Sequence, residues 1–191
     1  MVRPHLHETL RELTNYYQLV IFTASEQTYA DTILDCLDPD GTLFDARLYR
    51  QHCIETSCHS MGSTYIKDLR IIANRDLREV LLVDNSALCF SLQLDNGVPI
   101  LPFYWNKSDD ELLHLLYYLQ CVASADDVRV HNREAFQLRA LSEAHHEDRL
   151  DTSPVRHYSS ISSDYEFDSA PLEPKMGASR NKQENPRLGM V

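Results

Sequence analysis

Three short segments contain residue types that can handle a phosphoryl group. Thr23 follows one apolar run, Asp84 and Asn85 follow another, and Lys67 lies between them along the chain. A hydroxyl at a strand end can donate a hydrogen bond to a phosphate oxygen, and a lysine can neutralise phosphoryl charge. Carboxylate and amide oxygens are hard ligands of the kind that Mg²⁺ accepts together with water and a substrate phosphate. Each residue alone is a weak signal, but their joint occurrence in this order indicates phosphoryl chemistry.

The apolar runs 19–22 and 80–83 predict the strands that position these residues. Strands that are apolar on both faces are typical of a parallel sheet covered by helices on each side. Because ligands of open α/β sheets bind outside the carboxyl ends of the strands, Thr23 and the pair Asp84 and Asn85 are expected at that edge. Helices are expected over 6–13 and 29–37 and from a capping box at 108–111 through Leu119, and shorter strands over 46–50, 53–56, 64–66 and 98–101.

Composition and charge exclude several classes of function. The chain has 191 residues, and 18 Lys and Arg against 29 Asp and Glu give a formal net charge of −11. Such a chain is a poor candidate for non-specific binding to nucleic acid or to an anionic membrane, because phosphate contacts need surplus positive charge. No apolar run approaches the roughly 18 residues of a membrane span, and no secretory signal is visible. The scattered cysteines are expected to be reduced thiols of an intracellular protein, with Cys36 and Cys121 on buried helix faces.

The composition changes near residue 140. Apolar clusters recur throughout residues 1–135, which are expected to form the folded domain. Residues 140–191 contain a serine-rich stretch and four prolines but few large aliphatic side chains. Such a segment buries too little apolar surface to offset the entropy cost of ordering it. Residues 140–191 are therefore predicted to be a disordered tail.

Seven blocks of the chain resemble a known family. The blocks are Phe22-Thr23-Ala24-Ser25, Tyr29-Ala30-Asp31, Ala46-Arg47-Leu48-Tyr49-Arg50, Cys53, Tyr65-Ile66-Lys67-Asp68-Leu69, Val83-Asp84-Asn85-Ser86 and Asp95-Asn96-Gly97-Val98-Pro99-Ile100. Over about residues 3–130 the chain resembles the small phosphatases of the RNA polymerase II C-terminal domain, whose homology domain also occurs in Dullard-type phosphatases and in a mitochondrial presequence-translocase receptor subunit. All belong to the haloacid dehalogenase superfamily. The resemblance implies a three-layer, Rossmann-like parallel sheet with helices on both faces.

The resemblance also implies roles for individual residues. Thr23 corresponds to the phosphate-binding hydroxyl of the second motif, and Lys67 to the third-motif lysine that steadies a phosphoaspartate. Asn85 corresponds to a direct Mg²⁺ ligand, and Asp84 supports the metal site. The cofactor implied is Mg²⁺, and the reaction is dephosphorylation of phosphoserine or phosphothreonine in proteins such as the polymerase tail.

Two further residues are expected on the substrate side of the site by the same resemblance. Ser25 and Arg50 are assigned to substrate binding. The partner implied is a phosphoprotein or phosphopeptide, with no nucleic acid and no membrane segment in this chain.

The chain departs from the family at the residue that the chemistry needs most. The family's nucleophile is the first Asp of an Asp-x-Asp-x-Thr signature, and covalent catalysis by a carboxylate requires that residue. The chain has no Asp before Asp31. The run His5-Leu6-His7-Glu8-Thr9-Leu10 imitates the signature, but it lies too close to Thr23, and Arg3-Pro4 matches the opening of the helix before the second motif. The chain is therefore expected to be inactive.

The missing signature also has a structural consequence. In the family the first-motif strand lies between the strands that end at Thr23 and Asp84. Without it, both strands would expose unpaired backbone groups along a buried edge, at about 1–3 kcal/mol per group. The sheet is expected to lack its central strand, so that the chain is either an N-terminally incomplete phosphatase domain or one that survives by local repacking.

Other readings of the sequence remain open. The fold could serve as a non-catalytic peptide-docking module, as in the translocase receptor branch, or the chain could be a degenerate product without independent function. His52, Cys53, Cys58 and His59 have residue types that could bind zinc. The expected location is the nucleus or cytoplasm, and the mitochondrial inner membrane only if an upstream segment is missing.

Overall fold

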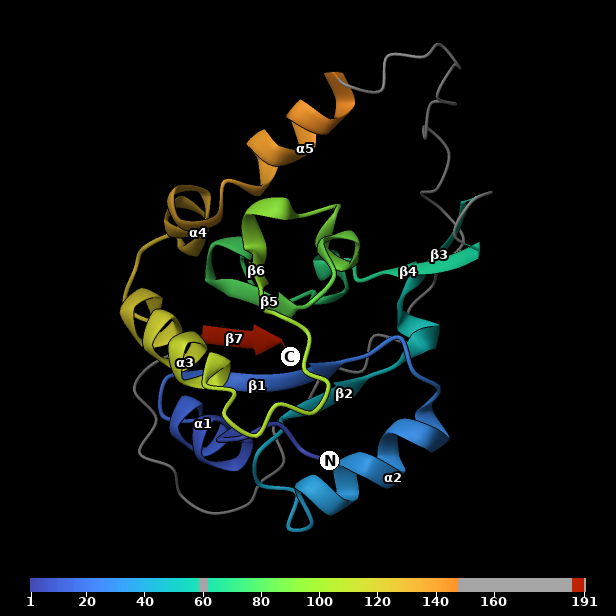
Figure 1. Cartoon of the computed structure of the whole chain (residues 1–191), viewed down its shortest axis with the longest axis vertical. Helices are drawn as coiled ribbons and strands as arrows, with labels where there is room; N and C mark the ends of the chain where they lie inside the picture. The colour runs from blue at the N-terminus through green and yellow to red at the C-terminus, as the bar shows by residue number, and fades with distance from the viewer. Residues whose placement is uncertain (59–61, 148–186, 191) are drawn as a thin grey trace.

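The computed structural model describes residues 1–58, 62–147 and 187–190 (Figure 1). The helices in these ranges are α1 (Leu6–Leu13), α2 (Gln27–Leu37), α3 (Glu111–Val122), α4 (Val128–Phe136) and α5 (Leu138–Glu147). The strands are β1 (Tyr17–Phe22), β2 (Ala46–Leu48), β3 (Ile54–Cys58), β4 (Gly62–Ile66), β5 (Val80–Asp84), β6 (Gly97–Pro99) and β7 (Arg187–Met190). Short 3₁₀ turns are η1 (Arg50–His52), η2 (Leu69–Ile71), η3 (Leu77–Glu79), η4 (Ala87–Phe90) and η5 (Leu94–Asn96).

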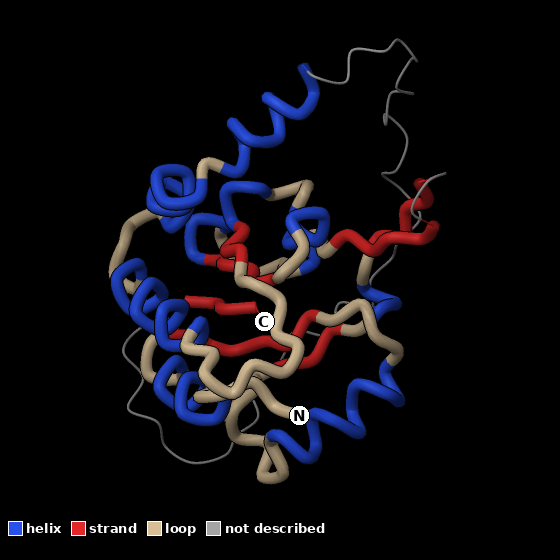
Figure 2. The backbone as a smooth tube through the Cα atoms, viewed as in Figure 1, coloured by secondary structure: helices blue, strands red, loops and turns tan. Residues whose placement is uncertain are grey.

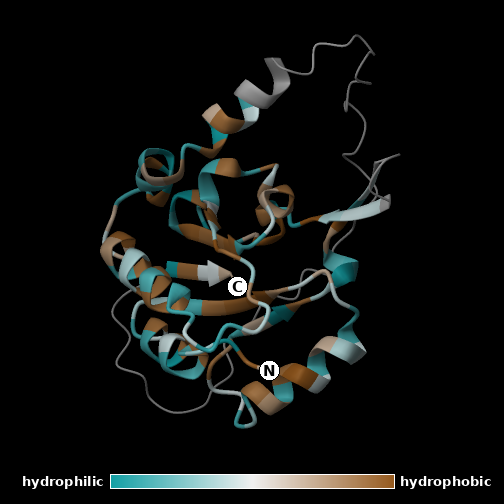
Figure 3. Cartoon of the chain, viewed as in Figure 1, coloured by the Kyte–Doolittle hydropathy of each residue, from teal (hydrophilic) through white to brown (hydrophobic). Residues whose placement is uncertain are grey.

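A parallel sheet with the strand order β2-β1-β7-β5-β6 forms the centre of the molecule (Figure 2). β3 and β4 form a separate antiparallel hairpin. The strands β1 and β5, which are buried almost throughout, carry the apolar runs seen in the sequence (Figure 3). The predicted α/β class with a parallel sheet is confirmed.

The centre of this sheet is filled by a strand that the sequence did not indicate. β7 lies between β1 and β5 and runs parallel to both (Figure 1). Gly189 is in register with Leu19 on one side and with Leu81 on the other. The unpaired edges expected along β1 and β5 therefore do not occur at these positions, because β7 supplies their hydrogen-bond partners. The central position is occupied, but by a segment from the other end of the chain.

Most of the predicted tail lies outside the described residues, namely 148–186 and residue 191. Its two described ends differ from the prediction. Residues 140–147 continue helix α5, and residues 187–190 form β7. The strand forms because the two open edges of β1 and β5 offer hydrogen bonds and burial that no local pattern within the tail reveals.

Two apolar clusters lie on the two faces of the sheet. One cluster joins side chains of β1 and β5 to α1, α2, α3 and the start of α4. The second joins the opposite side chains of β1 and β5, together with Leu188 and Met190 of β7, to Leu69 of η2 and Phe90 of η4. Within the described chain, the second face is thus covered largely by short 3₁₀ turns.

Helix details differ from the sequence-based expectation in three places. α3 begins at Glu111 after Asp110, so the expected capping box at Ser108 does not start the helix. α2 buries Ala30 and Leu34, whereas Tyr29 and Ile33 of the predicted stripe are exposed. Cys36 and Cys121, expected in the core, are exposed because they lie on the solvent side of α2 and α3. In the part of the chain that the structure describes, no helix is long and apolar enough to cross a membrane.

Candidate functional site

A buried ion pair joins the ends of two strands. Lys67 directly follows β4, and Asp84 is the last residue of β5. The Lys67 ammonium Nζ lies 2.5 Å from Asp84 Oδ2, and the two side chains are only 7% and 10% exposed. Ser86 N donates to the other carboxylate oxygen, Oδ1, at 2.8 Å. Such a pair concentrates charge where solvent screens it poorly.

The Lys67 side chain also reaches the end of β1. Its Nζ lies 5.9 Å from the centre of the Phe22 ring, and Phe22 is the last residue of β1. The backbone of Lys67 is held in place because its N–H donates to the carbonyl of Cys89 at 2.8 Å. The ammonium group therefore lies where the carboxyl ends of β1 and β5 meet.

Thr23 occupies the first position after β1. Its N–H donates to the carbonyl of Leu48 at 2.9 Å, which continues the pairing with β2 for one more residue. Its hydroxyl Oγ1 accepts a hydrogen bond from Ser25 N at 3.1 Å, which turns the chain sharply after the strand. A hydroxyl that accepts from the backbone keeps its own hydrogen available for an oxygen acceptor.

Arg50 holds the turn after β1. Its Nε donates to the carbonyl of Ala24 at 2.8 Å, and its backbone N–H donates to the carbonyl of Ser25 at 3.0 Å. Its guanidinium also pairs with Glu26 at 2.9 Å and lies 5.2 Å from the centre of the Tyr65 ring. The predicted substrate-binding residue Arg50 is thus engaged in shaping the loop that contains the other predicted substrate-binding residue, Ser25.

Two cysteines lie against the ion pair. Cys53 Sγ is 3.8 Å from the carbonyl oxygen of Thr23, and burial raises the pKa of its thiol although Lys67 opposes the shift. Burial, with a contribution from the Asp84 charge, raises the pKa of Cys89 to about 11. Both side chains are therefore neutral thiols at physiological pH and add no charge to the site.

The described residues do not complete a site for a resident Mg²⁺. Both oxygens of Asp84 are engaged, one with Lys67 and one with Ser86 N. Asn85 is exposed and adds a single amide oxygen. Over residues 1–58, 62–147 and 187–190, no group of three or more His, Cys, Asp and Glu side chains could hold a metal ion. A cation would have to displace the lysine, so the Mg²⁺ role predicted for Asp84 and Asn85 stays a prediction.

The structure places Thr23 and Asp84 at the carboxyl ends of β1 and β5 in the central sheet. Lys67 comes from the end of the separate β3–β4 hairpin and reaches Asp84 and the Phe22 ring beside Thr23, and Arg50 reaches the same loop as Ser25. Sequence reasoning missed Cys89, which arrives through the turn η4, and the stacking of Tyr65 on Arg50. Of the predicted zinc ligands, His59 lies outside the described residues and the Cys58 side chain is not described either.

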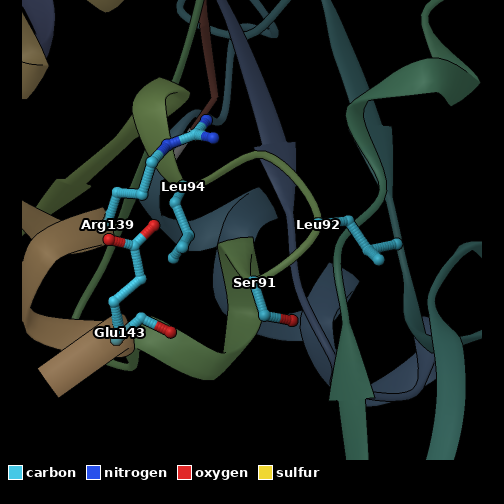
Figure 4. A pocket seen from close by; sticks show the side chains of 6 residues that line it. Ser91, Leu92, Leu94, Arg139 and Glu143 are labelled. Atoms are coloured by element: carbon cyan, nitrogen blue, oxygen red, sulfur yellow. The ribbon is translucent and has the colours of Figure 1, made fainter. Parts of the chain in front are cut away.

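The surface hollow shown in Figure 4 is a different place. It has a volume of about 230 Å³ and is lined by residues of the η4–η5 turn and of α5, including Leu94, Arg139 and Glu143. It shares no residue with the site of Lys67 and Asp84. Arg139 there is paired with Asp95 at 2.8 Å.

The chain is similar in sequence to known proteins over the part that contains the candidate site residues. The family model described as NLI interacting factor-like phosphatase matches residues 1–129. "CTD small phosphatase-like protein 2" of Dictyostelium discoideum is 37% identical over 139 residues, which cover 73% of this chain and 23% of the relative. The human "Carboxy-terminal domain RNA polymerase II polypeptide A small phosphatase 1" is 40% identical over 126 residues, covering 66% of this chain and 46% of the relative.

A solved structure of Fcp1, described as an essential RNA polymerase II CTD phosphatase, is 20% identical with a TM-score of 0.44, and the match covers 81% of this chain and 40% of Fcp1. The chain spans less than half the length of each of these proteins. The family match includes the segments that carry Thr23, Lys67 and Asp84. By this match the chain belongs to the NLI interacting factor-like phosphatase family.

Proposed function

We propose that this chain is a phosphatase-type domain that binds phosphoserine or phosphothreonine segments of proteins and does not hydrolyse them. The observation that carries the proposal is the buried Lys67 ammonium, held where β1 and β5 end and paired with the carboxylate of Asp84. The family match supports the phosphoprotein class of ligand. The polymerase tail named in the human relative is one candidate within that class.

The binding chemistry rests on two side chains. An ammonium group has three donors, and Asp84 takes one of them at 2.5 Å. The remaining donors of Lys67 and the hydroxyl hydrogen of Thr23 are suited to phosphate oxygens. Because Lys67 is only 7% exposed, a phosphate that reaches it gains more from its charge than it would in bulk water.

We expect no turnover because the described part of the site contains no free carboxylate that could accept a phosphoryl group. Covalent phosphoryl transfer in this family needs a free carboxylate beside the phosphate. In the described part of the site Asp84 is the carboxylate that contacts Lys67, and both of its oxygens are already engaged. Asp68, the next acid along the chain from Lys67, is bound by Arg70 and Gln93 instead.

The proposal is tested by binding and turnover measured on the same protein. Calorimetry with a phosphoserine peptide and its unphosphorylated twin should show at least about tenfold tighter binding of the phosphorylated form, since about 1.4 kcal/mol suffices for that ratio. Lys67→Met should abolish this preference, whereas Lys107→Met, which changes an exposed lysine, should keep it. Thr23→Val provides a second variant that leaves the ion pair intact.

Hydrolysis of a small aryl phosphate, with and without added Mg²⁺, should stay at the background rate. Turnover that disappears in Lys67→Met would show that the chain is an active phosphatase and would refute the second half of the proposal. Equal binding of both peptides would instead favour the alternative of a docking module that ignores phosphorylation.

The proposed location is the nucleus or its envelope. Relatives in fission yeast and zebrafish carry the nuclear envelope in their names, "Nuclear envelope morphology protein 1" and "CTD nuclear envelope phosphatase 1B". Imaging of the tagged full chain tests the location, and a mitochondrial pattern would contradict it.

A further inference from the structure

The central strand β7 is unusual in where it comes from. Its hydrogen-bond partners are β1 and β5, at residues 17–22 and 80–84. The chain reaches β7 only after residues 148–186, which the structure does not describe. The middle of the sheet is therefore closed by four residues at the end of a long connection.

The position between β1 and β5 imposes clear requirements on its occupant, and we call it the strand slot. The occupant must run parallel to both neighbours and form hydrogen bonds on both edges. Leu188 and Met190 are buried among the side chains of the second cluster, with exposed fractions of 6% and 0%. Between them Gly189 faces Leu19 and Tyr17, with which an added Cβ would make ordinary van der Waals contact at 3.5 Å.

The first residue of β7 has an unsatisfied hydrogen-bonding group. One guanidinium nitrogen of Arg187, Nη1, is buried without a hydrogen-bond partner among the described residues. A buried unpaired donor weakens the docking of the strand that carries it. The strand slot thus holds its occupant mainly through backbone pairing and two apolar side chains, which are contacts that any copy of the same segment can make.

We propose that the strand slot also accepts Arg187–Met190 from a second copy of this chain, so that two copies exchange β7 and form a closed dimer. The contacts in cis and in trans are identical, which is the condition for exchange of an element between protomers. The number of residues from 148 to 186 sets an upper limit of about 130 Å on the distance that β7 can lie from α5, at the roughly 3.3–3.6 Å per residue of a fully extended chain, and this limit allows β7 to reach the slot of a second copy. This inference does not depend on the proposed function.

The concentration at which exchange appears follows from the connection. Because β7 and its own slot belong to one chain, β7 competes for that slot at an effective concentration on the order of 1 mM. The chain should therefore be a monomer at about 10 µM and should gain a dimer fraction as its concentration approaches about 1 mM. A reciprocal exchange satisfies both slots, so the series should stop at the dimer.

The test uses the full chain and measures its mass by light scattering over this range of concentrations. The expected result is a shift from 22.1 kDa toward twice that value. Excess synthetic peptide covering residues 184–191 should return the dimer to peptide-bound monomer, because the peptide fills both slots. The same peptide with Leu188→Asp and Met190→Asp should have no effect.

Two variants of the full chain test whether the dimer depends on β7 or on another surface. The strand-deficient variant carries Leu188→Asp and Met190→Asp, and its control carries Leu101→Asp and Leu141→Asp at positions 66% and 58% exposed. The strand-deficient variant should form no dimer with itself and should be stabilised in thermal melts by the unmodified peptide, whereas the control should behave as the parent chain. If the strand-deficient variant does not fold alone, recovery of its fold on adding the peptide supports the proposal equally.

Three results would overturn the proposal. The first is a parent chain that stays monomeric at about 1 mM and binds no peptide. The second is a dimer that persists in excess peptide, which would place the interface elsewhere. The third is a strand-deficient variant that the peptide neither stabilises nor refolds.

Discussion

Replacing Met190 is the sharpest test of whether residues 187–190 form the central strand of the sheet or belong to an unstructured tail. It is fully buried, at 0% exposure, and packs in the cluster of Phe22, Leu82 and Phe90. Met190→Ala removes most of this side chain from a packed site and leaves a cavity. Substitutions of this kind cost about 2–5 kcal/mol. Against a total stability of about 5–15 kcal/mol, the loss should be large.

The measurement is urea unfolding followed by far-UV circular dichroism at about 10 µM chain, where little strand exchange is expected. Trp105 is 75% exposed and would report poorly on the core, so fluorescence is the weaker probe. Leu101→Ala is the control, since Leu101 is a large apolar residue that is 66% exposed, and it should change the free energy of unfolding by less than about 0.5 kcal/mol.

If Met190→Ala behaved like this control, β7 would not occupy the centre of the sheet. The strand order β2-β1-β7-β5-β6 and the proposed exchange of β7 would then both be wrong. A loss of 2 kcal/mol or more, about the lower limit for such a cavity, would show that residues at the end of the chain stabilise strands formed near its beginning.

Two other predictions concern packing and pH. Gly97→Ala should destabilise the chain by about 1–3 kcal/mol in the same unfolding assay, because an added Cβ would overlap the buried Phe90 ring; an unchanged midpoint would show that the ring has room to move. The hydrogen bonds from Arg129 lower the pKa of Asp127 from 3.8 to about 2, so this carboxylate stabilises the fold above pH 4 and its contribution is lost as the pH falls toward 2. In urea titrations from pH 5 to about pH 2, Asp127→Asn should flatten the fall in stability. Asp126→Asn, at an exposed neighbour, should leave the fall as steep as in the parent chain, and equal slopes for all three proteins would contradict the assignment.

The sheet's two main strands could be predicted because their signal is local. The runs 19–22 and 80–83 are apolar on both faces, and only a covered parallel strand buries both faces at once. β7 lacks such a signal. It has four residues, follows a proline, and alternates buried Leu188 and Met190 with Arg187 and Gly189. Its burial comes from two open edges far away in the sequence, which no window of a few residues contains.

The helices illustrate the same limit. The stripe on α2 predicted the helix correctly but not which of its side chains would be buried, since Tyr29 and Ile33 face solvent while the smaller Ala30 is buried. Helical periodicity reports that a face is apolar, whereas burial depends on what packs against that face. The expectation for Cys36 failed for the same reason.

The positions of the candidate site residues that follow the strands of the central sheet could be predicted from the sequence. The position of Lys67 could not. Thr23 and Asp84 follow from the rule that ligands bind at the carboxyl ends of parallel strands. Lys67 was singled out by its residue type and its place between the two apolar runs, and the family resemblance gave it a role. Its position in space depends on the hairpin of β3 and β4 and on its backbone hydrogen bond to Cys89. That bond joins a strand end to a 3₁₀ turn, a contact for which the sequence has no periodic signal.

The register of β7 shows that the architecture of this sheet and its chemistry are separable. Met190 pairs with Val20 on one side and with Leu82 on the other, so the described strand ends two residues before the positions of Phe22 and Asp84. The four described residues of β7 therefore complete the sheet below the level of Lys67 and Asp84 and add no carboxylate beside them. Pairing of the backbone requires only an extended segment with small and apolar residues, whereas phosphoryl transfer requires a carboxylate at one defined position. A strand that meets the first requirement alone can complete the sheet without supplying such a carboxylate, and this supports the proposal of phosphopeptide binding without turnover.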